Sequence, residues 1–160
     1  MITRQPDASV ADWPLTERPG FLIRRLQQIH VALFAEACAA FDVTPVQYSL
    51  MSALRRRGSA DQTTLAEDVS LDRTTATGAL KRLEARGFVA RATSSADRRA
   101  QACRLTSLGL DTLRRMEPSA QRAHRDTMAL LPAGDRGLLI NLMTRLVAAH
   151  DEERSAGSRC

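Results

Sequence analysis

The chain of 160 residues is 44% hydrophobic and 26% charged, which suits one ordinary globular domain or a smaller domain with attached oligomerisation helices. Its formal net charge is +5. No apolar run approaches the roughly 20 residues of a membrane span and no secretion signal opens the sequence, so we expect a cytoplasmic protein without a membrane partner. Three widely spaced cysteines argue against a disulfide framework and a zinc site.

The first 43 residues fall into two parts. Residues 1–15 are polar, contain two prolines, and are expected to be a flexible N-terminus. From residue 16 onward, apolar side chains recur at helical spacing as far as Phe41. This spacing predicts one long amphipathic helix in the segment 16–43, ending near Asp42.

Capping signals divide the next stretch into helices. Thr44 and Pro45 are typical of an N-cap and a first helical residue, and the helix that they begin is expected to end at Gly58. Asp61 precedes a short helical segment, and Asp72 caps a further helix. Two short helices joined by a tight turn are typical of a helix-turn-helix.

Two segments of alternating apolar and polar residues follow, at 88–93 and 100–106. With a polar loop between them, they predict a β-hairpin. Thr106 then caps a long helical region in which Pro118 predicts a kink or a break. A strongly apolar last helix follows, and the chain ends in a charged tail.

This order of elements favours a mainly α-helical fold with a small β wing, that is, a winged helix-turn-helix. The lobe with this fold is predicted to occupy residues 44–106. The segments 16–43 and 107–150 carry more apolar surface than so small a core can cover, so we expect them to be dimerisation helices in a C2 homodimer. Residues 151–160 are expected to be a polar tail.

The positive charge is concentrated in residues 72–104. This stretch has eight Arg or Lys residues and three acidic residues, whereas the segments on either side are close to neutral. A basic surface on a helix and hairpin predicts a polyanion partner, most commonly nucleic acid. Because aromatic residues make up only 4% of the chain, duplex DNA is favoured over single strands, which are bound by stacking on exposed rings.

The helix capped by Asp72 would be the one that enters the major groove. If Ala76, Leu80 and Leu83 face the core, the opposite side of the helix is free to contact DNA. The candidate DNA-binding residues on that side are Arg73, Thr74, Thr75, Thr77, Gly78, Lys81 and Arg82. A threonine hydroxyl can bond a phosphate or base edge while its methyl packs on thymine, and a glycine costs helix stability that close approach of the backbone would justify. The alternative is an ordinary solvated helix face.

The hairpin loop adds Asp97, Arg98 and Arg99. An arginine at a hairpin tip can enter a narrow minor groove, where the negative potential is enhanced. Phosphate would repel Asp97, so we expect this carboxylate to brace a neighbouring arginine or to shape the turn. The alternative is an exposed type I turn with no role in binding.

Residues 72–109 resemble the recognition helix and wing of the MarR family (multiple antibiotic resistance regulators). The family's Asp-Arg-Arg is matched at 97–99 and its Leu-Thr-x-x-Gly at 105–109, and the likeness extends over about residues 18–150. The resemblance implies homodimeric transcriptional regulators that bind pseudo-palindromic operators in double-stranded DNA, usually as repressors, and release them when a small molecule or an oxidant arrives. It also implies that Arg99 is the arginine for the minor groove.

The resemblance leaves the effector open. Similar regulators respond to phenolic or aromatic carboxylates, sometimes as thioesters, in a pocket between the DNA-binding lobe and the dimerisation helices. Arg24, Arg25 and His30 are polar groups within the apolar stripe of the first helix, and either arginine could clamp a carboxylate bidentately. The alternatives are an arginine pair in dimer or surface ion pairs and a histidine at the interface.

Two other mechanisms stay open at this point. Cys38 is the candidate for a thiol-based redox sensor, although no helix N-terminus or neighbouring cation in the sequence lowers its pKa. A winged helix used only for protein contacts would carry an apolar, weakly charged recognition helix and wing, whereas these are polar and basic.

An enzyme is the least favoured class. The three histidines lie on separate segments without acidic residues at metal-ligand spacing, and the sequence contains no nucleophile motif and no phosphate-binding loop. We therefore expect no catalytic residue, no metal and no cofactor.

Overall fold

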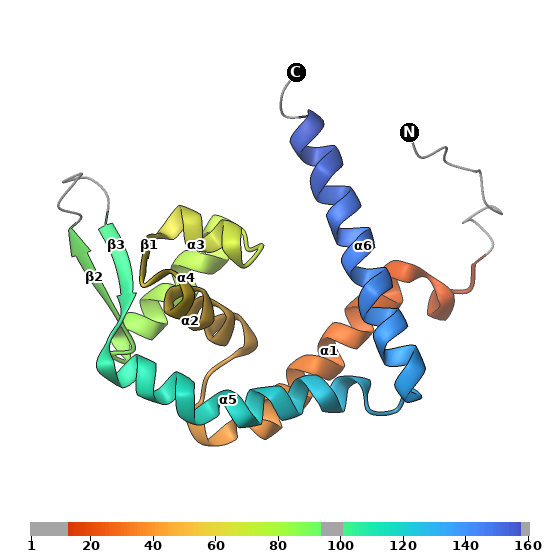
Figure 1. Ribbon diagram of the computed structural model, residues 1–160, viewed down its shortest axis with the longest axis horizontal. Helices are drawn as coiled ribbons and strands as arrows, with labels where there is room; N and C mark the ends of the chain where they lie inside the picture. Colours follow the sequence, from red (N-terminus) through yellow and green to blue (C-terminus); the bar gives the residue numbers. More distant parts are fainter. Residues whose placement is uncertain (1–12, 94–100, 158–160) are drawn as a thin grey trace. The chain divides into compact units, whose positions relative to one another are not determined.

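The computed structural model describes residues 13–93 and 101–157 (Figure 1). The helices are α1 (Pro19–Ala37), α2 (Pro45–Arg57), α3 (Gln62–Asp68), α4 (Arg73–Ala85), α5 (Ser107–Met128) and α6 (Ala133–Gly157); the strands are β1 (Ser59–Asp61), β2 (Val89–Thr93) and β3 (Gln101–Leu105). The mainly helical fold with a small antiparallel sheet agrees with the prediction. The chain divides into two compact units between His124 and Arg125. None of the described helices is long and apolar enough to cross a membrane.

Helices α2, α3, α4 and α5 begin at the caps that the sequence predicts. At α2, Thr44 and Gln47 form a capping box: the Thr44 hydroxyl accepts from the Gln47 amide at 3.2 Å, and the Gln47 side chain accepts from the Thr44 amide at 2.9 Å. At α4, Asp72 accepts from the Thr75 amide at 2.8 Å. A cap of this kind contributes about 1 kcal/mol, so the start of the recognition helix is set locally.

The wing belongs to a three-stranded antiparallel sheet in the order β1-β3-β2. Strands β2 and β3 form the predicted hairpin, with Val89 opposite Leu105 (Figure 1). The sequence does not predict β1, which pairs with β3 from Ser59, opposite Arg104, to Asp61. Three residues are too few to show an alternating pattern, because such a strand is specified by its partner rather than by its own sequence.

The Leu-Thr-x-x-Gly pattern has a structural cause at the junction of wing and α5. The Thr106 hydroxyl donates to the Gly87 carbonyl at 2.6 Å and accepts from the Gly109 amide at 3.0 Å, so it caps α5 and ties it to the end of α4. A Cβ at Gly109 would lie 2.0 Å from the Phe88 carbonyl oxygen. Only glycine allows the helix to start so close to β2.

A single hydrophobic core joins the lobe to parts of α1 and α5. Besides residues of α2, α3 and α4, its members include Phe34 from α1, Cys38 directly after α1, and Leu113, Met116, Ala120 and Ala123 from α5. The assignment of the whole of 16–43 and 107–150 to dimerisation is therefore too broad. The second half of α1 and most of α5 complete the core, because the short helices of the lobe cannot enclose it alone.

Two expectations for the C-terminal half are corrected. Helix α5 runs from Ser107 to Met128 through Pro118, so the helix does not break at the proline, one of the two outcomes that the sequence predicts there. Burial of Met116 and Ala120 on either side of the proline stabilises the helix there. Helix α6 continues to Gly157, so most of the segment 151–160 is helical rather than a separate polar tail.

Helix α6 has no buried residue in the described chain. Its large apolar side chains are exposed instead, namely Leu138, Ile140, Leu142, Met143, Leu146 and Val147. Apolar residues in the first half of α1 are exposed as well, among them Leu22 and Ile23. These surfaces are candidates for burial against another molecule.

Candidate nucleic-acid interface and ligand pocket

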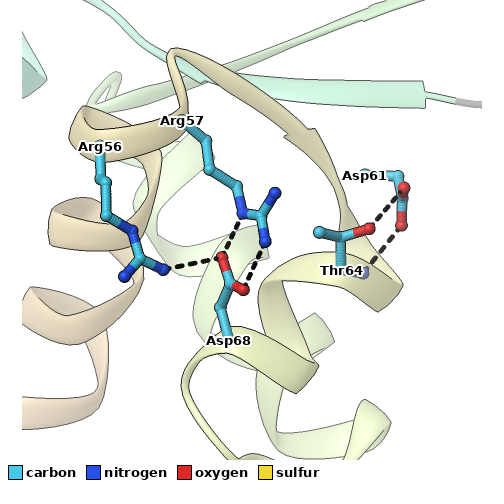
Figure 2. Close-up of polar contacts among 5 residues, drawn as sticks. All are labelled: Arg56, Arg57, Asp61, Thr64 and Asp68. Atoms are coloured by element: carbon cyan, nitrogen blue, oxygen red, sulfur yellow. Dashed lines mark hydrogen bonds and ion pairs between the residues drawn. The ribbon is translucent and has the colours of Figure 1, made fainter.

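The helix that precedes the recognition helix is fixed at both ends (Figure 2). At its end, the Asp68 carboxylate accepts from Arg57 through both oxygens, one bond being 2.7 Å long, and lies 3.3 Å from Arg56. At its start, Asp61 accepts from the amide and the hydroxyl of Thr64, each at 2.9 Å. The hydrogen bonds from Arg57 and from Thr64 lower the pKa values of Asp68 and Asp61, respectively. Both carboxylates therefore remain charged: Asp61 caps the start of α3, and Asp68 holds its end against α2.

Helix α4 directs its predicted inner side, Ala76, Leu80 and Leu83, into the core. On the outer side Arg73, Thr74, Thr75, Lys81 and Arg82 are exposed, while Thr77 and Gly78 are half-buried. No ion pair within the described residues neutralises Arg73, Lys81 or Arg82. The outer side is thus a basic face that is positioned by the core and not neutralised by the protein.

The three threonines of this face are not equivalent. The Thr75 hydroxyl donates to the Asp72 carboxylate at 2.5 Å, and this bond lowers the pKa of Asp72. The Thr77 hydroxyl donates to the Arg73 carbonyl at 2.6 Å and accepts from a glutamine side chain of α3. In the described part of the chain, only the Thr74 hydroxyl among the three has no partner. The sequence alone does not distinguish them.

The glycine of α4 has space beside it. A Cβ at Gly78 would meet only Arg82 Nη1, at 3.6 Å, which is an ordinary contact. No packing among the described residues therefore requires a glycine at this position.

The predicted residues of the wing loop, Asp97, Arg98 and Arg99, lie outside the described residues. The strands beside the loop are described: Arg91 on β2 lies 3.0 Å from the carboxylate of Glu84, which connects the wing to α4. Arg104 on β3 is exposed and adds a positive charge to the sheet.

The second candidate site is a cavity of about 480 Å³ within the first compact unit. Its lining comprises His30 and Phe34 from α1; Pro45, Tyr48, Ser49, Ser52, Ala53, Arg55 and Arg56 from α2; Asp68 and Val69 at the end of α3; and His124 from α5. The rings of His30 and His124 stack with centroids 5.0 Å apart and planes 20° apart. The ring centroids of Phe34 and Tyr48 lie 5.6 Å apart. The rings of two histidines, a phenylalanine and a tyrosine therefore line the wall.

Both arginines of the cavity wall already have carboxylate partners. Arg55 donates to the two oxygens of Glu117 at 2.9 and 3.2 Å, and this pairing lowers the pKa of Glu117. Arg56 lies beside Asp68, as described above. Burial raises the pKa of Tyr48, so its phenol stays protonated at neutral pH. The cavity wall therefore combines aromatic rings with several polar and charged side chains, groups that could bind and orient a small molecule.

Comparison with known proteins identifies the chain. The model of the MarR family matches residues 43–100, from just before α2 into the wing. The HTH-type transcriptional repressor NicR of Pseudomonas putida is 30% identical over 145 residues, which are 91% of this chain and 90% of the relative. This chain belongs to the MarR family.

Solved structures agree with the family assignment. The DNA binding of BpsR of Bordetella bronchiseptica is regulated by 6-hydroxynicotinic acid. BpsR is 28% identical to this chain and superposes on it with a TM-score of 0.79. The match covers 84% of this chain and 96% of BpsR. The transcriptional repressor CouR, solved with a 23-mer DNA duplex, gives a TM-score of 0.75 at 28% identity over 83% and 94% of the two chains. The MarR-family chain is therefore a DNA-binding transcriptional regulator with a winged-helix fold.

Only one of the three effector residues that sequence predicts for this MarR-family regulator lines the cavity. His30 does so, whereas Arg24 and Arg25 are exposed on α1 and are absent from the lining. Arg24 lies over the ring of Phe21, and Arg25 donates to a neighbouring glutamine at 3.4 Å. The sequence analysis missed His124, which is distant from His30 in sequence, and no local pattern pairs the two.

The environment of Cys38 opposes a redox role. The thiol is 1% exposed, and burial raises its pKa although Arg122 acts in the opposite direction. Reactive cysteines are accessible and have lowered pKa values. In this MarR-family regulator Cys38 is a core residue.

Proposed function

We propose that this MarR-family regulator is a homodimeric repressor that binds a pseudo-palindromic operator and releases it when a small aromatic carboxylate, or its thioester, occupies the cavity. The observation that carries the proposal is the basic outer face of α4, exposed and not neutralised, on a helix-turn-helix fixed by Asp68. The regulation of BpsR by 6-hydroxynicotinic acid supports the class of effector.

The outer face of α4 fits a major groove. Arg73 and Thr74 are exposed at the start of the helix, where they can donate hydrogen bonds to phosphates or base edges. Thr75 and Thr77 have bonded hydroxyls, so their contribution to recognition would come from their methyl groups. The space beside Gly78 allows the helix backbone to approach DNA closely. Lys81 and Arg82 would contact phosphates.

The wing would contact the flanking minor groove. In this proposal Arg99 enters the groove with Arg98 beside it, and Asp97 braces one of them. A dimer with two such lobes would place its recognition helices about 34 Å apart, in successive major grooves. The exposed apolar residues of α6 and of the first half of α1 support dimerisation, because a second copy of the chain would cover them.

The DNA-binding proposal is tested on an operator selected from a library of random duplexes. We expect Arg73→Ala and Arg99→Ala each to weaken binding by roughly tenfold or more, and to reduce the slope of log affinity against log salt by about one for each phosphate that the variant no longer neutralises. Arg114→Ala is the matched control, since it removes the same charge from an exposed position on α5.

Wild-type affinity in both variants would remove α4 and the wing from the mechanism. If the selection yields no preferred sequence, the winged helix is a module for protein contacts instead. Equal losses in Arg114→Ala would mean that only the overall charge matters.

The effector proposal is tested by operator release. Benzoate, 4-hydroxybenzoate and 6-hydroxynicotinate are added to the complex of operator and protein, and release is followed by fluorescence anisotropy. We expect release by at least one of these acids and no response to peroxide, with Cys38→Ser behaving like the wild type. Release by peroxide that Cys38→Ser abolishes would favour the redox alternative. Arg24→Ala and Arg25→Ala measure whether either arginine clamps the acid.

A further inference from the structure

Each arginine of the cavity wall has a carboxylate partner before any ligand enters. Arg55 is paired with Glu117, and Arg56 shares Asp68 with Arg57. An anionic ligand therefore meets no unpaired guanidinium among the described lining residues. Its negative charge must be compensated in another way, because an uncompensated charge in a partly buried site is costly.

The stacked histidines offer that compensation. His30 and His124 come from α1 and α5 and lie face to face on the cavity wall, with ring centroids 5.0 Å apart. Burial, followed by the nearby charge of His124, lowers the pKa of His30. Without a ligand, His30 is therefore neutral at pH 7. A carboxylate beside the two rings reverses this preference, since an opposite charge favours the protonated imidazole.

The other titratable groups of the wall do not exchange protons near neutral pH. They are Tyr48, Arg55 and Arg56 on α2 and Asp68 at the end of α3. The pKa of Tyr48 is raised and that of Asp68 is lowered, which keeps the phenol neutral and the carboxyl ionised. Within the described lining, the remaining titratable side chains are the two imidazoles.

We propose that the His30–His124 pair is the anion anchor of the cavity, and that each aromatic carboxylate bound there brings one proton from solvent onto the pair. The proton becomes part of a charge-assisted hydrogen bond between an imidazole N–H and the carboxylate, and no covalent bond changes. This inference rests on the proposed effector function. It adds that the regulator responds to acid and to ligand together, with affinity rising up to tenfold for each unit that the pH falls in the range where His30 is neutral without ligand.

The test is calorimetry on the full-length protein with benzoate, 4-hydroxybenzoate and 6-hydroxynicotinate. Titrations at pH 7.5 in buffers of different ionisation enthalpy give the number of protons taken up, and titrations from pH 6.5 to 8.5 give the dependence of affinity on pH. We expect an uptake of about one proton and a matching slope. Amides of the same acids, which carry no charge, should cause no uptake.

Three variants test whether His30 and His124 take up the proton. His124→Gln and His30→Gln should each weaken acid binding by tenfold or more and flatten the pH dependence, whereas His150→Gln, at an exposed position on α6, should keep both. Operator binding without ligand checks that the variants are folded. If either pocket variant fails this check, the NMR signals of the imidazole C–H groups in the wild type, recorded with and without acid, show directly whether His30 or His124 becomes protonated.

The outcomes separate this inference from the proposed function. An acid that binds and releases the operator without proton uptake overturns the histidine anchor, points to a permanent cation such as Arg24 or Arg25, and leaves the effector function intact. Uptake that survives in both pocket variants also overturns the anchor. If none of the three acids binds, both the anchor and the proposed class of effector are wrong.

Discussion

The winged-helix lobe and helix α6 are both rich in apolar residues, yet they bury them differently. Leu65 and Leu80 in the lobe are 0% exposed, whereas Leu138 and Leu146 in α6 are both 57% exposed. The lobe completes its core within one chain, with help from α1 and α5. Helix α6 has no buried residue among those that the structure describes. The stability of the lobe should thus be an intramolecular property, while the contribution of α6 should depend on a second molecule.

The largest expected difference in stability comes from truncating one leucine to alanine in each region. Leu80→Ala should reduce the free energy of unfolding by about 3 kcal/mol at any protein concentration, because it leaves a cavity in a closed core. Leu138→Ala should cost less than about 1 kcal/mol at low concentration, and more only where dimers form. Urea unfolding at several protein concentrations measures both. Equal, concentration-independent losses would mean that α6 also folds against its own chain.

A pair of glycine substitutions sharpens the same contrast. Gly109→Ala should destabilise the lobe by about 2 kcal/mol, since the new Cβ would collide with the Phe88 carbonyl. Gly137→Ala has nothing within 4 Å of its Cβ and should be neutral or stabilise α6 by up to about 1 kcal/mol. Thermal unfolding monitored by circular dichroism compares the two. A stable Gly109→Ala protein would show that α5 can shift away from β2.

The apolar face of α6 can be tested by adding a charge. If the proposed dimer forms through α6, Leu146→Asp should raise its dissociation constant by at least tenfold, about 1.4 kcal/mol, because a carboxylate would have to be buried on association. Sedimentation velocity measures the change, and Arg145→Gln on the same helix, which also changes the net charge by −1, is a control for charge alone. An unchanged dimer in Leu146→Asp would place the interface elsewhere.

Acidification should destabilise mainly the first compact unit, which ends at His124. Hydrogen bonds and ion pairs lower the pKa values of Asp61, Asp68, Asp72 and Glu117, all of which lie before residue 125. Below the ordinary carboxyl pKa near 4, the unfolded chain takes up protons that the folded chain resists. The stabilisation is therefore complete above that pH and lost as the pH falls through the lowered values.

Urea titrations between pH 6 and pH 3 measure this loss. Asp68→Asn should be less stable than the wild type at pH 6, and its stability should fall less on acidification. A variant that follows the wild-type curve at every pH would show that the Arg57 pairing contributes nothing to folding.

Local signals in the sequence predicted much of the lobe. Thr44, Asp61 and Asp72 begin helices as expected, since a side-chain oxygen that accepts from an amide three residues later acts within one turn. The inner face of α4 follows from the spacing of Ala76 and Leu80. The three-residue strand β1 had no such signal.

The candidate sites divide in the same way. The basic outer face of α4 could be predicted because its residues are neighbours on one helix. The cavity could not, because it is formed by residues distant in sequence: His30 meets His124, and Arg55 meets Glu117. Arg24 and Arg25 lie on the same helix as His30, but only His30 lines the cavity. This difference depends on which part of α1 faces the core.

The sequence by itself determined the winged-helix family, the order of the helices and the hairpin, and the basic surface of the recognition helix, because periodicity, caps and net charge act over a few residues. Tertiary structure alone decided which threonine hydroxyl stays free, why position 109 must be glycine, and that two histidines stack on a cavity whose arginines are already paired. These features depend on contacts between distant segments, which form only when the core has closed.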